Sequence, residues 1–121
     1  MSYQTQCVKI RLEPNSLDRV REWATTLNKS RRAEAMATLA DESVVFEAAF
    51  LDRTNDGDFL IYIMKAESFE KANRAAATSL HEIDAYHQAF KRDTWGTRTE
   101  LELLLDVDLR DEQSAGRGDS D

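Results

Sequence analysis

The chain has 121 residues, 41% of them apolar, which suits one domain with a hydrophobic core. Its 23 acidic and 16 basic residues give a net charge of −7, which repels phosphate backbones, so we expect no nucleic-acid partner. The sequence has one cysteine, no apolar run of about 18 residues and no charged-then-apolar leader. We therefore expect a cytoplasmic protein with no internal disulfide and no membrane partner.

The first predicted element is a strand over residues 4–13. Val8, Ile10 and Leu12 alternate with polar neighbours, which is the period of a half-buried strand. Pro14 and the residues that follow it then supply a stop, a turn former and an N-cap.

A long helical pattern runs from Leu17 to about Leu39, with Trp23 at the edge of its apolar stripe. This length is unusual for a small domain, so we expect a bend or short break near residues 28–30.

Two strands and a tight turn follow. Residues 44–53 and 58–66 are β-branched and aromatic runs, and the Asp56-Gly57 pair between them tolerates positive φ. Both faces of this hairpin are largely apolar. We expect helices to cover one face and a partner chain to cover the other. The face covered by the partner would include Tyr62 or its neighbours and Glu47.

A second helical stretch spans about residues 68–95. Ser79 and Glu82 form the S-x-x-E pattern of a capping box, so either one helix or two can occupy this stretch. Alternating leucines then predict a fourth strand from Arg98 to Leu109. Residues 110–121 lack large apolar side chains and predict a disordered acidic tail.

The order strand, helix, strand, strand, helix, strand predicts an α+β, ferredoxin-like βαββαβ fold over residues 1–109, with a four-stranded antiparallel sheet and helices on one face. The second sheet face would remain exposed in a single chain. We therefore expect a homodimer that buries this face.

Several motifs between Val8 and Trp95 resemble a family of uncharacterised prokaryotic proteins in the dimeric α/β-barrel group. The resemblance rests on RVREWATTLN, the SRRAEAMATLADESVVFEAAFLD block, GDFLIYIMKAE and HEIDAYHQAF, and the specific patterns are SxHxIDxYH and FLxxxxxGDxLIYxM. It implies a homodimer with a cleft between sheet and helices, but no particular reaction, because the group includes mutarotases, isomerases, cofactor-free monooxygenases and proteins of unknown role. The family often has proline where this chain has Glu82.

The two histidines, His81 and His87, are candidate site residues. Six helical residues separate them by about 9 Å along the axis and roughly 120° around it, so they cannot share one metal ion. His87 could exchange a proton with a small carbonyl or sugar-like ligand, oriented by Asp84 and assisted by Tyr86. The alternative is that His87 only bonds a polar group at the core edge. His81 lies in a first helical turn, where anions are favoured.

Glu47 is the second candidate, because a carboxylate on an otherwise apolar strand is costly unless it is paired. Lys9, Arg11 or Arg31 could pair with it and form a polar pocket floor for an acidic or hydroxylated ligand, to which Tyr62 is also a candidate contributor. The alternative is an ion pair between strands or subunits.

The sequence has no glycine-rich phosphate loop, zinc-ligand spacing or dinucleotide fingerprint, so we expect neither cofactor nor metal. Our leading hypothesis is a homodimer that binds a small polar or aromatic metabolite in a sheet/helix cleft. Catalysis, if present, would be a cofactor-free isomerisation with His87 or Glu47 as base, and with Tyr86 and an arginine steadying an oxyanion. The alternative is a non-catalytic dimerisation or interaction module.

Overall fold

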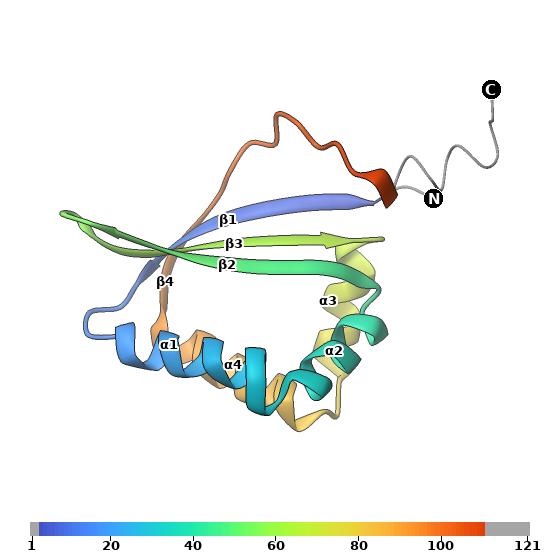
Figure 1. Ribbon diagram of the computed structural model, residues 1–121, viewed down its shortest axis with the longest axis horizontal. Coiled ribbons are helices and arrows are strands. Elements are labelled where there is room, and N and C mark those ends of the chain that lie inside the picture. The colour runs from blue at the N-terminus through green and yellow to red at the C-terminus, as the bar shows by residue number, and fades with distance from the viewer. Residues whose placement is uncertain (1–2, 111–121) are drawn as a thin grey trace.

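The computed structural model describes residues 3–110, which form one antiparallel sheet with helices on one of its faces (Figure 1). In chain order, the elements are β1 (Gln4–Leu12), α1 (Leu17–Thr25), a π-helical turn η1 (Thr26–Ser30), α2 (Arg32–Asp41), β2 (Val44–Thr54), β3 (Gly57–Ala66), α3 (Phe69–Thr78), α4 (Glu82–Thr94) and β4 (Trp95–Glu100). The strand order is β2-β3-β1-β4. The predicted ferredoxin-like α+β fold is confirmed. The described residues end at Arg110, so the expected acidic tail lies outside them after that residue.

The predicted break in the first helical stretch is confirmed and is a π-helical turn. The amide of Arg31 donates to the carbonyl of Thr26 at 2.8 Å, five residues back, which widens the helix by one residue. Arg31 then leaves helical geometry, with φ −123° and ψ 28°. Because of this turn, α1 and α2 can follow different parts of the curved sheet.

The second helical stretch divides in two, but without the predicted capping box. The N-cap of α4 is His81, and the hydroxyl of Ser79 accepts from the His81 amide at 3.1 Å. Ser79 also donates a short hydrogen bond to Asp84. Ser79 therefore stabilises the turn before α4, and Glu82 is simply the first helical residue.

The core lies between the sheet and the helices. Val8, Ile10 and Leu12 of β1 are all buried, as the alternation predicts. They pack with α1 and α4 in a cluster whose centre is Phe90, at 0% exposure. Burial of a side chain of this size contributes about 2 to 3 kcal/mol, so this cluster is a principal source of stability.

The prediction that Tyr62 and Glu47 lie on the second sheet face is wrong. Tyr62 pairs with Val8 in the β1/β3 register and is 7% exposed, facing the helices. Glu47 pairs with Met64 and points to the same side. The outer face instead exposes Phe46 and Phe50, by 43% and 59%.

The predicted fourth strand is shorter than expected and begins earlier. Pairing with β1 ends near Cys7, whose carbonyl accepts from the Leu101 amide at 2.9 Å, and residues 101–108 form no strand. This segment crosses the outer side of the sheet (Figure 1), where the buried Lys65 pairs with Asp106 at 2.8 Å and Asp108 at 3.0 Å. The ion pairs draw the segment away from the β1 edge.

The alternating apolar side chains of this C-terminal segment are exposed. Their exposures range from 41% for Leu101 to 86% for Leu104. Residues 101–109 therefore have the pattern of a half-buried strand, but the described part of the same chain offers no apolar surface that covers them.

Candidate functional site

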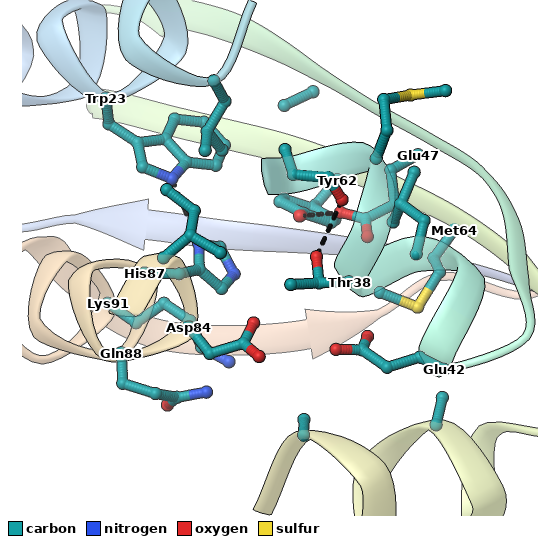
Figure 2. Close-up of a pocket in the computed structure, with 18 of the residues that line it drawn as sticks. Trp23, Thr38, Glu42, Glu47, Tyr62, Met64, Asp84, His87, Gln88 and Lys91 are labelled. Carbon is teal, nitrogen blue, oxygen red and sulfur yellow. Dashed lines mark hydrogen bonds between the residues drawn. The ribbon is translucent and has the colours of Figure 1, made fainter. Parts of the chain in front are cut away.

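A cavity of about 500 Å³ lies between the helix-facing side of the sheet and the helices (Figure 2). Its volume falls in the range of about 300–1,000 Å³ that is typical of small-molecule sites. Apolar lining comes from Leu27, Leu39, Met64 and several alanines. The principal polar side chains are Glu42, Glu47, Tyr62, Asp84, His87, Gln88 and Lys91. The cavity thus combines an apolar wall with several convergent polar groups.

His87 faces the cavity as a hydrogen-bond donor. The indole Nε1–H of Trp23 donates to His87 Nδ1 at 3.1 Å, and an indole nitrogen can only donate. Nδ1 must therefore be unprotonated. Burial, assisted by Lys91, lowers the pKa of His87 to about 4, so the ring is neutral at pH 7 and its proton is on Nε2.

Trp23 is itself held in place by aromatic packing. Its ring stacks on Phe90 with centroids 4.4 Å apart and lies 5.7 Å from His87. Trp23 is 4% exposed. Because Trp23 is buried and stacks on Phe90, the hydrogen bond that fixes the His87 tautomer is part of the core.

Glu47 forms the floor of the cavity together with Tyr62 of the neighbouring strand. The Tyr62 hydroxyl donates a short hydrogen bond to the Glu47 carboxylate. Burial raises the pKa of Glu47, whereas the Tyr62 hydrogen bond acts in the opposite direction. The partner is therefore Tyr62 rather than the expected Lys9, Arg11 or Arg31. One Glu47 oxygen is tied to Tyr62, and the side chain borders the open space.

Glu42, just after α2, brings a second acidic group to the cavity. Its side chain points toward Asp84 across the cavity (Figure 2). Burial is the largest cause of a pKa raised to about 7, and the carboxylates of Asp84 and Glu47 add to it. Near neutral pH, Glu42 therefore exists as a mixture of acid and carboxylate, which is the condition in which a carboxyl group can both give and accept a proton.

We expect Glu42→Gln to stabilise the protein above pH 7 and to leave its stability unchanged near pH 4. The folded protein retains the Glu42 proton up to about pH 7, whereas the unfolded chain loses it near its ordinary pKa. The free energy of unfolding therefore falls as the pH rises through this window. Because Glu42 is only half-buried, the gain in the variant should be about 1 kcal/mol after solvent screening.

The measurement is the melting temperature of both proteins from pH 4 to pH 9, where about 1 kcal/mol corresponds to roughly 4 °C. Glu22→Gln, on the exposed side of α1, is the matched control and should show no pH-dependent difference. Parallel curves for Glu42→Gln and the parent would contradict the raised pKa.

Tyr86 and Arg31, both predicted site residues, do not line this cavity. Successive helical residues differ by about 100° around the axis, so Tyr86 cannot share the direction of His87. Its hydroxyl reaches Thr26 Oγ1 at 3.4 Å, and Arg31 stacks over its ring at 5.8 Å. Arg31 also pairs with Glu34 at 2.6 Å. These two residues connect α4 to the π-helical turn.

His81 and Arg11 also lie outside the cavity. His81 pairs with Asp41 at 2.7 Å, and this hydrogen bond raises the pKa of the exposed imidazole. Arg11 projects from the other side of the sheet, where its guanidinium donates to the Asp56 carbonyl at 2.6 and 2.8 Å. The sequence could not reveal that His81 pairs with Asp41 or that Arg11 pairs with Asp56, because each pair joins segments that are far apart in the chain.

Of the eight predicted site residues, the cavity brings together Glu47, Tyr62, Asp84 and His87. Sequence reasoning missed Glu42 and Lys91. Lys91 follows His87 by four residues, so helical spacing alone could have placed it on the same face. Glu42 follows α2 in a turn, where no periodic pattern indicates its direction.

Within residues 3–110, no group of three or more His, Cys, Asp and Glu side chains is arranged to hold a metal ion. Across the same range, no helix has the length and apolar character required to cross a membrane.

Solved structures with the same fold share little sequence with this chain. PA3566 from Pseudomonas aeruginosa has a TM-score of 0.54 at 13% identity, covering 87% of this chain and 97% of that one. A NIPSNAP-like domain protein from Burkholderia xenovorans has a TM-score of 0.53 at 13% identity, covering 86% and 85%. SnoaB, a cofactor-independent oxygenase from Streptomyces nogalater, has a TM-score of 0.51 at 14% identity, covering 88% and 98%. These likenesses establish the fold alone.

No curated protein sequence matches the chain. A family model does match, over residues 3–112, and its description is "Family of unknown function (DUF6176)". The match includes every strand and helix described above and all residues of the cavity. The chain therefore belongs to this family of unknown function, DUF6176.

Proposed function

We propose that the protein is a homodimer that binds a small polar or aromatic metabolite in the cavity between sheet and helices, and that it catalyses a cofactor-free proton transfer such as an isomerisation. The observation that supports this most strongly is that Glu47, Glu42 and His87 line one cavity. Their surroundings make Glu42 and Glu47 proton acceptors and His87 a donor. Groups with such separated protonation behaviour in one pocket are typical of acid–base catalysis.

In this proposal Glu47 is the base and His87 the hydrogen-bond donor, which reverses the role that the sequence suggested for His87. The Nδ1 lone pair of His87 is occupied by Trp23, and a protonated Nε2 cannot accept a proton. Nε2–H is instead suited to a carbonyl oxygen on which negative charge develops. Tyr62 orients Glu47 through its hydroxyl. Glu42 is a second group that can return the proton.

The proposed dimer rests on the outer sheet face. Phe46 and Phe50 expose apolar side chains there, and the leucines of residues 101–109 are exposed as well. A second copy of the same chain supplies a face of matching size and character. Large contiguous apolar patches are rarely left open to water.

The second candidate function is a non-catalytic dimerisation or interaction module. The outer face favours it, because that face lies on the opposite side of the sheet from the cavity and does not need the cavity in order to bind a partner. A cavity that binds no ligand in any screen, together with intact assembly, would select this candidate.

A thermal-shift screen of hydroxycarbonyl and aromatic metabolites tests the binding proposal. A ligand at ten times its Kd should raise the melting temperature by about 5 °C. His87→Ala should abolish this increase without changing the assembly state, because it removes the Nε2–H donor. Glu47→Gln should keep binding but lose exchange of the ligand's acidic C–H with deuterated water.

The control for both variants is Arg21→Ala, on the exposed side of α1, which should respond to ligand as the parent does. An unchanged ligand response in His87→Ala would remove His87 from the site. Undiminished deuterium exchange in Glu47→Gln would remove Glu47 as the base.

A further inference from the structure

Lys91 is a half-buried lysine on the wall of the cavity. It lies on α4 one turn after His87 and lines the same space (Figure 2). Within residues 3–110, its ammonium group forms no ion pair or hydrogen bond; its described contact is the ring of Trp95, at 4.9 Å from the centroid. Most surface lysines are fully hydrated, whereas this one is half-buried, contacts an aromatic ring and lines the cavity.

The charged groups around Lys91 come from several elements. Arg98 of β4 is the cationic neighbour, while Glu47 of β2 and Glu42 after α2 are the anionic ones. Burial and Arg98 lower the pKa of Lys91, and the two glutamates oppose them only in part. Desolvation and a nearby cation are the two conditions under which a lysine amine becomes nucleophilic near neutral pH.

We propose that Lys91 is a covalent nucleophile that forms an imine with aldehydes or ketones entering the cavity. The inference rests on the proposed small-molecule cavity and adds the class of ligand, a carbonyl compound. Three features of the structure support it together: Lys91 lines the cavity, its ammonium has no ion-pair partner among residues 3–110, and proton-exchanging carboxyl groups lie on the facing wall.

The residues of the cavity can supply the hydrogen bond and the proton transfers that imine formation requires. The Lys91 nitrogen lone pair attacks the carbonyl carbon, a C–N bond forms, and the C–O π electrons move to oxygen. That oxygen receives a hydrogen bond from His87 Nε2–H and then a proton from Glu42. The attacking nitrogen then gives one of its protons to the Glu42 carboxylate, which passes it to the new hydroxyl group. The C–O bond breaks, water leaves, and the nitrogen lone pair forms the C=N bond. The product is a protonated imine, and Glu47 can remove a proton from the adjacent carbon because the imine accepts the electron pair.

Reductive trapping of the full chain tests the proposal. Benzaldehyde and sodium cyanoborohydride at pH 7 should attach one benzyl group preferentially to Lys91, as measured by peptide mass spectrometry. The internal reference is Lys71, which is exposed on α3. The ratio of the two labelling rates should be about tenfold for each unit by which the pKa of Lys91 is lowered. The pH at half-maximal labelling should also be lower for Lys91 than for Lys71.

Lys91→Arg keeps the positive charge but cannot form an imine, so it should remove only the preferred label. Lys71→Arg is the matched control and should leave the Lys91 label intact. Circular dichroism establishes that both variants are folded. Equal labelling of Lys91 and Lys71 in the parent overturns the inference.

Benzyl alcohol separates this inference from the binding proposal, because it has the same ring but no carbonyl group. If benzyl alcohol raises the melting temperature and Lys91 is labelled no faster than Lys71, the covalent role is overturned while the cavity remains a binding site. Preferential labelling of Lys91 supports both the covalent role of Lys91 and the binding proposal, since the aldehyde must enter the cavity to reach this residue.

Discussion

Replacing Phe50 by aspartate should convert the proposed dimer to a monomer. Phe50 is 59% exposed on the outer sheet face and lies beside Ile61 of the next strand. In the proposed sheet-to-sheet interface, an unpaired carboxylate at this position would be desolvated without compensation. The cost of about 3 kcal/mol or more weakens the dimer by over a hundredfold in Kd.

Size-exclusion chromatography with light scattering measures this change against the 13.8 kDa mass of one chain. Arg21→Asp introduces the same side chain on the exposed side of α1, and it should leave the proposed dimer unchanged. A monomeric parent protein would refute the dimer at once. The cavity would survive that result, because residues of one chain line all the described parts of it.

Phe90→Ala should cause a larger loss of stability than any of the other substitutions above, about 3–5 kcal/mol. Phe90 is 0% exposed, and its ring is the stacking partner of Trp23. Truncation leaves a void beneath the indole and removes the support that holds the Trp23 hydrogen bond to His87. The free energy of unfolding of a domain this size is only about 5–15 kcal/mol, so the variant should be marginally folded.

Urea denaturation gives the free energy of unfolding, and the melting temperature should fall by about 15 °C or more. Leu80→Ala is the matched control, since the Leu80 side chain is 98% exposed and its truncation should change stability by less than about 0.5 kcal/mol. A loss below about 1 kcal/mol in Phe90→Ala would contradict the placement of this ring at the centre of the core.

The candidate site was predictable only where one element positions a residue. His87 and Asp84 share one face of α4 because they are three residues apart, and helical spacing is sufficient to show it. The same helical geometry explains why Tyr86 does not line the cavity, since its direction differs by about 100° from that of His87. The donor role of His87 could not be predicted, because it depends on Trp23, which lies 64 residues away in sequence.

The hairpin illustrates a second kind of failure. Both faces of β2 and β3 are largely apolar, so hydrophobic alternation cannot determine which face meets the helices. A register shift between Val44 and Phe46 adds one residue and changes the direction of the side chains that follow. Glu47 consequently points into the cavity, while Phe50 points outward.

The sequence by itself determined the order of the strands and helical stretches up to residue 100, the break in the first helical stretch and the ferredoxin-like topology, because helical and strand periods are local properties of the backbone. Only the tertiary structure decided that Glu42, Glu47, His87 and Lys91 share a cavity and that the leucines of residues 101–109 remain exposed. Those outcomes depend on strand register, helix rotation and ion pairs such as Lys65 with Asp106. Each of these joins segments that are distant along the chain, and no local pattern contains that information.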